Sequence, residues 1–477
     1  MSKSMIFYNA QLVDSHLDSP GAIIVTDKKI RSVFIGKCSD EKSAKRLIAA
    51  TLTEKDLANG IPELINCHQL TLMPSFVDMH VHFRYPGQTQ KEDLDSGLQA
   101  AVAGGFGTLV LMPNTMPVVS TQKMARGIIK EAEEKNLAHV FQTISITKDF
   151  AGTDTTELDA LNSAKIPVIT EDGHDVENAA VMLEAMQKAG KNNVIVSCHC
   201  EDVSLAKAAR PFRERALGFM KKYGIPADKY NVPTKDVPPS INFEIDGNLT
   251  AANRLLALAE DTATERNIEI AKIAGCHVHI AHCSTAVSID AVRRAKAQIA
   301  AGTAPAGFSV SAEVTPHHLS LSGIEAPFLR ALVNPPLRSE RDRRAIIKAI
   351  KDGTVDVIST DHAPHTPEDK AAGSPGFTGL ETSFAVCNTV LVKNEHFPLS
   401  KLSELMSDKP AQLLNLQAGR FALGYDADFV LVNPDEEWTV DSSRFFSKGK
   451  STPQNGADVT GRVHATYFGG EKVFELE

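Results

Sequence analysis

From residue 75 onward, eight short apolar segments alternate with helical patterns and loops, and this repeat constrains the fold more than any other feature. The segments are 75–82, 108–112, 139–146, 167–170, 194–198, 277–281, 308–314 and 355–359. Their length and composition predict buried strands, and intervening patterns such as 96–103, 121–135, 179–189 and 339–351 predict helices. Because no glycine-rich dinucleotide fingerprint follows the first strand, the repeat favours a closed (β/α)₈ TIM-type barrel over an open doubly wound sheet.

The segments on either side of this repeat are both rich in strand patterns. These patterns lie at 5–13, 22–24 and 30–35, and again at 428–432, 463–468 and 472–476. Neither terminal segment is large enough to enclose a core alone. We therefore expect residues 1–72 and 419–477 to form one small β-sandwich beside a metal-dependent catalytic barrel of residues 73–418.

Two further stretches look like insertions. Residues from about 38 to 60 are charged and carry alanine and lysine, which predicts a solvated helical insertion on the small β domain. Residues from about 212 to 266 contain four prolines and separate two predicted strands by more than a crossover helix needs. We expect this second insertion to consist of loops and helices near the active-site face.

Composition narrows the classes of function. The net charge of -9, without a basic stripe, argues against a nucleic-acid partner and favours a small-molecule substrate. No apolar stretch is long enough to span a bilayer, and the first residues lack the apolar core of a secretion signal, so we expect no membrane association and a cytoplasmic protein. The seven scattered cysteines fit reduced thiols in that compartment.

The first predicted strand of the barrel ends with two histidines, His80 and His82, that have one residue between them. Side chains alternate along a strand, so both imidazoles lie on the same side of it. Two histidines on a rigid strand could be half of a metal site, although core histidines with satisfied hydrogen bonds are the simpler explanation for an isolated pair.

Four other predicted strands also end in metal-ligating residue types, namely Asp172, His199, His282 and Asp361. Each has an ordinary explanation as a turn, a helix cap or a core histidine. In (β/α)₈ enzymes, however, the active site lies at the carboxyl ends of the strands, and here five strand ends carry such residues together. Four histidines and two carboxylates are enough for two metal ions that share a bridging carboxylate, which is a hydrolytic centre.

Several sequence blocks occur in the order in which one enzyme family has them. They are DMHVHFRYPGQTQKED, LVLMPNTMPV, ITEDG, CHCED, HIAHCST, VNPPLR, STDHAPH and HATYFGGEKVFE. Outside the two insertions, the chain thus resembles the bacterial type I dihydroorotases, which are cyclic amidohydrolases of the amidohydrolase superfamily. This resemblance implies a zinc-dependent hydrolase that reversibly interconverts N-carbamoyl-L-aspartate and L-dihydroorotate in de novo pyrimidine biosynthesis.

The resemblance also implies how the metals are held. It implies two Zn2+ ions per chain, the first held by His80, His82 and Asp361 and the second by His199 and His282. Asp172, together with a hydroxide, would bridge the two ions, where many superfamily members use a carboxylated lysine.

The same resemblance suggests roles around the substrate. Arg84, Asn114 and His365 would hold its exocyclic carboxylate, and Asn334 would make a polar contact to the ring. Asp361 would be the catalytic residue that accepts the proton of the hydroxide and returns it to the leaving nitrogen. We expect residues 366–379, which are polar and rich in glycine, to act as a lid, with a plain flexible loop as the alternative.

Two other functions stay open. One is another cyclic amidohydrolase, such as a dihydropyrimidinase, hydantoinase or allantoinase; Arg84 together with Asp172 favours dihydroorotase over these. The other is a non-catalytic dihydroorotase-like scaffold for aspartate transcarbamoylase. The presence of a ligand residue at all six positions argues against this second function. We expect a homodimer, and association with aspartate transcarbamoylase is compatible with an active enzyme.

Overall fold

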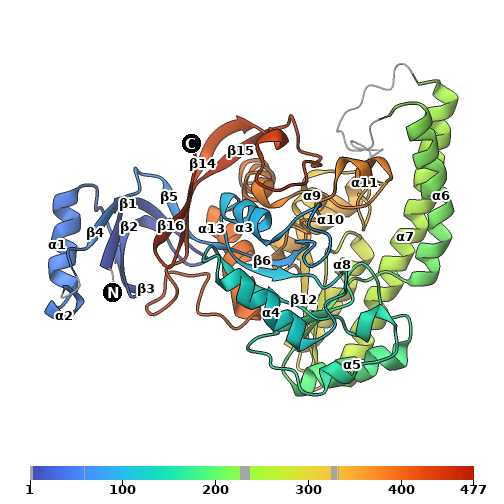
Figure 1. The fold of residues 1–477 in the computed structure, drawn as a ribbon, viewed down its shortest axis with the longest axis horizontal. Coiled ribbons are helices and arrows are strands. Elements are labelled where there is room, and N and C mark those ends of the chain that lie inside the picture. The colour runs from blue at the N-terminus through green and yellow to red at the C-terminus, as the bar shows by residue number, and fades with distance from the viewer. Residues whose placement is uncertain (1–3, 58–59, 226–236, 324–329, 331) are drawn as a thin grey trace.

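Eight parallel strands form the centre of the protein, in the order expected from the sequence. The computed structural model describes residues 4–57, 60–225, 237–323, 330 and 332–477 (Figure 1). The central strands are β6 (Phe76–Val81), β7 (Phe106–Leu111), β8 (His139–Gln142), β9 (Val168–Thr170), β10 (Ile195–Cys198), β11 (His277–Ile280), β12 (Ser309–Val314) and β13 (Val357–Ile358). Each lies within or beside one of the eight predicted segments, so the predicted repeat is confirmed.

The eight strands follow one another around a ring. Strands β6 to β8 form one parallel sheet and β9 to β13 form another. Isolated parallel bridges join the free edges of the two sheets, one between Val81 and His362 and one between Ile144 and Ile169. Through these bridges the strand order closes, as a (β/α)₈ barrel requires.

Helices surround this ring, and most of them begin at a residue that can cap them. The larger ones are α3 (Leu94–Ala103), α4 (Gln122–Glu133), α5 (Ala179–Lys191), α8 (Ala286–Ala300) and α10 (Glu340–Lys351). Side chains of Asp93, Thr121, Asn178, Thr285 and Ser339 accept hydrogen bonds from backbone N–H groups in the first turns of these helices. Shorter helices are α9 (Pro316–Ser320), α11 (Pro367–Ala371), α12 (Ser383–Cys387), α13 (Leu399–Ser403) and α14 (Lys409–Leu413).

Both ends of the chain contribute to one further sheet of eight strands. It contains β1 (Ser4–Val13), β2 (Asp18–Thr26), β3 (Lys29–Ile35), β4 (Glu63–Asn66), β5 (Thr71–Pro74), β14 (Phe429–Thr439), β15 (Asp458–Phe468) and β16 (Glu471–Glu475). The antiparallel pair of β5 and β14 joins the N-terminal and C-terminal strands. In the shared core, the ring of Phe7 meets Phe429 and Tyr467 edge-on, at centroid distances of 5.1 and 4.9 Å. The predicted small β domain is therefore built from both termini, as one continuous sheet.

The first predicted insertion is helical and covers a face of this sheet. It contains α1 (Glu41–Thr51) and α2 (Glu54–Leu57). Helix α1 buries Ala44 and Ile48 against Ile6 and Tyr8 of β1. The insertion therefore contributes to a hydrophobic cluster, in contrast to the fully solvated decoration expected from its charge.

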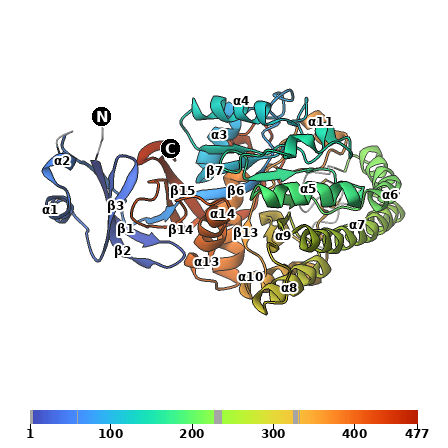
Figure 2. The same ribbon diagram turned by 90° about the horizontal axis from the view of Figure 1, so that it is seen from below.

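The second predicted insertion belongs to two long helices, α6 (Val203–Lys222) and α7 (Pro239–Ala274). They run side by side at the end of the molecule opposite to β1–β3 and α1 (Figures 1 and 2). The expected boundaries at 212 and 266 fall inside these helices, and residues 226–236 between them lie outside the described part of the chain. In the described ranges, no helix has both the length and the apolar character needed to cross a membrane.

Candidate metal centre

All six predicted metal ligands meet at the carboxyl ends of the barrel strands. His80 and His82 come from the end of β6, and the other four directly follow β9, β10, β11 and β13. The six side chains are buried, with exposed residue fractions of 1% for His80 to 6% for Asp361. The ring closure of the barrel brings these positions together, although up to 281 residues of chain separate them.

Asp172 occupies the middle of this group. Its Oδ1 atom lies 3.3 Å from Nε2 of His80 and 3.3 Å from Nδ1 of His199, and its Oδ2 atom lies 3.4 Å from Nε2 of His82. The Nε2 atom of His282 is 3.8 Å from the same Oδ1. Possible ligand atoms thus form two clusters that share Asp172, one with His80 and His82 and one with His199 and His282.

Asp361 completes the first cluster. Its Oδ1 atom lies 3.1 Å from Nε2 of His82 and 3.6 Å from Nε2 of His80. The backbone of Asp361 has a φ of 49°, in the left-handed region that few non-glycine residues adopt. Strain of this kind concentrates at functional sites, where surrounding contacts hold it in place.

Two atoms in this group show that the residues fit a metal ion. Nε2 of His80 and Oδ1 of Asp172 are buried, and neither makes a hydrogen bond within the described residues. An unpaired buried acceptor is costly, because it has lost water without gaining a partner. An imidazole nitrogen and a carboxylate oxygen are ordinary metal ligands, and a cation between them would satisfy both atoms.

Neighbouring acceptors orient the histidines. Nδ1 of His80 lies 2.7 Å from Oε1 of Glu313, and Nδ1 of His82 lies 2.9 Å from Oδ1 of Asn114. A carboxylate or amide oxygen can only accept, so each Nδ1 carries the proton and each Nε2 keeps a lone pair towards the centre. Such outer contacts commonly fix the tautomer and orientation of metal-binding histidines.

The electrostatics of the group favour a bound positive charge. Burial opposes ionisation of Asp172, but the imidazoles of His80, His199 and His282 hold the pKa of its carboxyl well below the usual range. Burial also disfavours the charged form of His199, yet the hydrogen bond and charge of Asp172 raise the pKa of His199 to about 9. The ionised carboxylate of Asp172 thus places a negative charge at the middle of the group, which a bound cation would balance.

Arg84 and His365 lie together beside the predicted metal ligands. The Arg84 Nε atom donates to the carbonyl of Pro364 at 3.2 Å, and its Nη2 atom lies 3.2 Å from Nε2 of His365. Burial lowers the pKa of Arg84 to about 10, against the opposing charges of Asp361 and Asp172, so the guanidinium stays charged at neutral pH. Burial and the adjacent Arg84 lower the pKa of His365 to about 3, so this ring is neutral. The pair is a buried cation with a polar neighbour.

The two predicted asparagines lie in different surroundings. The Nδ2 atom of Asn114 donates to Oδ2 of Asp172 at 3.2 Å, so this amide joins His82 and Asp172. Asn334 donates to Glu201 at 2.9 Å and accepts from Arg213 at 3.2 Å. Because Glu201 lies 4.0 Å from Nε2 of His199, this carboxylate connects Asn334 to the centre.

Two supporting carboxylates, Glu313 and Asp78, are absent from the site residues predicted from the sequence. Glu313 contacts both His80 and, at 3.1 Å, Nε2 of His279. Asp78 accepts hydrogen bonds from the N–H and hydroxyl groups of Thr360, next to Asp361. The available signal was their position on buried strands, β12 and β6, where an unpaired carboxylate is expensive.

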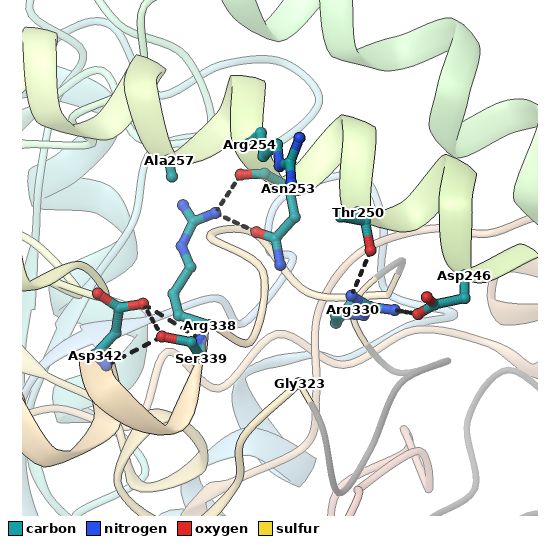
Figure 3. Close-up of a pocket in the computed structure, with 10 residues that line it drawn as sticks. All are labelled: Asp246, Thr250, Asn253, Arg254, Ala257, Gly323, Arg330, Arg338, Ser339 and Asp342. Atoms are coloured by element: carbon teal, nitrogen blue, oxygen red, sulfur yellow. Dashed lines mark hydrogen bonds and ion pairs between the residues drawn. The ribbon is translucent and has the colours of Figure 1, made fainter.

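Helix α7 supports the loop that follows His282. Arg338 donates to the hydroxyl of Ser284 at 2.9 Å and pairs with Glu260 of α7 at 3.0 Å, and Glu260 accepts from the Ser284 N–H at 2.8 Å. Figure 3 shows Arg338 reaching to Asn253 of α7 at the edge of a cavity of about 500 Å³. The long helix thereby helps to fix the loop that carries the predicted ligand His282.

A barrel with histidines and carboxylates gathered at five strand ends defines a metal-dependent hydrolase, and residues 256–473 match the Amidohydrolase family. Residues 70–226 match a family described as Dihydro-orotase-like. The dihydroorotase of Clostridium botulinum (strain Eklund 17B / Type B) is 35% identical over 98% of both chains, and that of Bacillus cytotoxicus is 33% identical over 97% of both. The chain therefore belongs to the dihydroorotase family.

Solved structures of related enzymes have the same fold. An L-hydantoinase (dihydropyrimidinase) from Arthrobacter aurescens has a TM-score of 0.78 at 23% identity, covering 100% of this chain and 96% of its own. A dihydropyrimidinase from Brevibacillus agri NCHU1002 has a TM-score of 0.74 at 19% identity, covering 100% and 95%. At these identities the similarity establishes the barrel and its attached sheet.

Proposed function

We propose that this protein is a dihydroorotase, which reversibly interconverts N-carbamoyl-L-aspartate and L-dihydroorotate in de novo pyrimidine biosynthesis. The observation that carries the proposal is the buried guanidinium of Arg84 beside His365 and the metal ligands. The described hydrogen-bond partners of this guanidinium, the carbonyl of Pro364 and the ring of His365, carry no negative charge. A substrate with a carboxylate on its ring would supply that charge. The full-length similarity to proteins named dihydroorotase supports the same substrate class.

We propose that the metal is zinc and that two ions bind per chain. His80, His82 and Asp361 would hold the first and His199 and His282 the second, with Asp172 as the ligand common to both. This division is supported by the two clusters that share Asp172. When bound, zinc supplies Lewis acidity and lowers the pKa of water at the site.

The remaining steps belong to side chains of this chain. Asp361 would accept a proton from the attacking water and return it to the ring nitrogen as the amide bond breaks. Arg84, His365 and Asn114 would hold the exocyclic carboxylate, and Asn334 would contact the ring. Burial of the ligands supports this arrangement, because charged groups act more strongly where water is excluded.

A substrate comparison tests the activity. The purified enzyme is expected to hydrolyse L-dihydroorotate and to cyclise N-carbamoyl-L-aspartate, with much lower kcat/KM for dihydrouracil, hydantoin and allantoin. Turnover of only the uncharged rings would instead indicate a dihydropyrimidinase, a hydantoinase or an allantoinase. Absence of turnover in a zinc-loaded, folded sample would favour a scaffold role.

A metal analysis tests the bridging residue. Asp172→Ala is expected to lose zinc and activity together, because it removes a ligand from both clusters. Retention of the full zinc content of the wild type together with its full rate would overturn the assignment of Asp172. We also propose that the protein is a cytoplasmic homodimer and that it can associate with aspartate transcarbamoylase. Light scattering of the protein alone tests the dimer, and light scattering of the mixture tests the association.

A further inference from the structure

A second group of possible metal ligands lies at the opposite end of the barrel from the metal centre. His139 is the first residue of β8, whereas the residues of the metal centre lie at or beyond the carboxyl ends of their strands. Asp426 and Asp428 precede β14 of the terminal sheet. All three line a cavity of about 470 Å³ where the barrel meets this sheet.

The ligand atoms of the three residues converge. Each residue offers one atom, and these atoms lie within 4.8 Å of one another. Nε2 of His139 is 3.2 Å from Oδ2 of Asp428. In a tetrahedral zinc site, each ligand atom is about 2.0–2.2 Å from the ion. Two such ligand atoms are then separated by a distance close to that between His139 and Asp428.

Asp428 provides independent evidence for a ligand. Only 5% of this residue is exposed, and its Oδ1 atom accepts a hydrogen bond from the N–H of Gly469 at 2.7 Å. Its Oδ2 atom, which faces His139, is buried and has no hydrogen-bond partner within the described residues. A buried carboxylate oxygen that lies 3.2 Å from an imidazole nitrogen without a hydrogen bond to it is costly unless a cation binds it.

We propose that His139, Asp426 and Asp428 bind a divalent first-row transition-metal ion, such as Zn2+, which joins the base of the barrel to the terminal sheet. The imidazole favours such an ion over magnesium or calcium, which prefer sites made of oxygen atoms. The rings of His139 and Phe468 meet edge-on at a centroid distance of 4.7 Å, and this contact holds the imidazole in place. The cavity leaves room for water to complete the coordination.

The competing explanation is a simple ion pair between protonated His139 and Asp428. Lys29 already pairs with Asp426 at 2.7 Å, so this explanation requires no metal. The two explanations differ in their expectation for metal binding, because an ion pair takes up no zinc.

Zinc stoichiometry after equilibrium dialysis of the full-length protein distinguishes them. His139→Ala and Asp426→Asn are each expected to bind one zinc ion fewer than the wild type while keeping hydrolytic activity. His464→Ala is the matched control, because His464 pairs with the carboxylate of Glu436 at 2.6 Å and belongs neither to the metal centre nor to the His139 group. Its zinc content is expected to equal that of the wild type. Equal zinc content in the His139 variant and the wild type would overturn the proposal.

Thermal unfolding gives a readout that is independent of the catalytic centre. In an Asp172→Ala background, added zinc is expected to raise the Tm, because a ligand that binds only the folded state stabilises it. Adding His139→Ala to this background is expected to reduce the shift. An identical shift in both proteins would contradict a site at His139. Circular dichroism establishes that each variant is folded before either measurement.

Discussion

Oε1 of Glu313 lies 2.7 Å from Nδ1 of His80, although β12, which carries Glu313, contributes no metal ligand. The same carboxylate accepts the backbone N–H of His282 at 3.2 Å. One side chain therefore orients a ligand of each proposed zinc ion, so its loss should weaken the whole centre.

Glu313→Gln is expected to lower zinc affinity by about 10- to 100-fold, the usual effect of losing an outer partner of a metal-binding histidine. The amide keeps the size of the side chain but cannot accept two hydrogen bonds with full charge. Competition with a chelator measures the affinity. Glu437→Gln, at an exposed position of β14, is the control, and equal affinities in the two variants would contradict the role of Glu313.

Arg84→Lys is expected to lower kcat/KM for L-dihydroorotate by roughly 10- to 100-fold, because lysine keeps the charge but loses the planar fork that a carboxylate matches. Steady-state kinetics with L-dihydroorotate measure this effect, and zinc content should be unchanged. Arg462→Lys on β15, where the guanidinium lies over Trp438, controls for general loss of arginine contacts. A fall of the same size in the control would remove the support for carboxylate binding by Arg84.

Lys370→Met is expected to loosen residues 366–379. The buried ammonium of Lys370 donates to the carbonyls of Leu332, Ser374 and Gly376 at 3.3, 2.7 and 2.8 Å. The carbonyl of Pro375, between the last two, lies 2.9 Å from Nε2 of His365.

Misplacement of this segment should therefore reduce kcat/KM by roughly 10- to 100-fold with zinc content intact. Kinetics and metal analysis of the same preparation measure both quantities. Lys472→Met, on the exposed part of β16, serves as the control. Unchanged turnover in Lys370→Met would argue against a catalytic role for this segment as a lid.

Glu381→Gln is expected to change how stability depends on pH. Burial raises the pKa of Glu381 to about 7, although its carboxylate accepts hydrogen bonds from the N–H groups of Phe446 and Ser447, which lower the pKa. The charge of Lys450 also lowers this pKa, and the charge of Glu92 raises it. An acid with a raised folded pKa keeps its proton where the unfolded chain has lost it. Its contribution to stability is therefore complete at low pH and declines as the pH rises to about 7.

The glutamine variant lacks this decline. Relative to the wild type, its free energy of unfolding should increase by up to roughly 3 kcal/mol between pH 5 and pH 8. Urea denaturation at the two pH values measures the difference, with Glu177→Gln at an exposed loop position as the control. A difference that does not change with pH would show that Glu381 titrates normally.

Local patterns were sufficient for the repeated elements. The apolar runs that became β6 to β13 and the capped helices between them have signals within a few residues, so their order could be predicted. The extents of helices α6 and α7 are harder to predict. The prolines and charged residues in 212–266 are typical of loops, and the packing of the two helices against each other cannot be read from local patterns. Glu313 was missed for a related reason, since a single carboxylate in an apolar run gives no indication of its partner.

The alternation of strands and helices can be predicted from local sequence patterns, and so can the position of the predicted ligands, among them His80, His82 and Asp172, at strand ends. The convergence of these ends, the contact of Glu313 with His80, and the contact of His139 with Asp428 at the other end of the barrel become visible in the folded chain. The physical reason is that alternation depends on neighbouring residues. The contacts depend on ring closure and on pairing of the two chain ends, which join residues hundreds of positions apart.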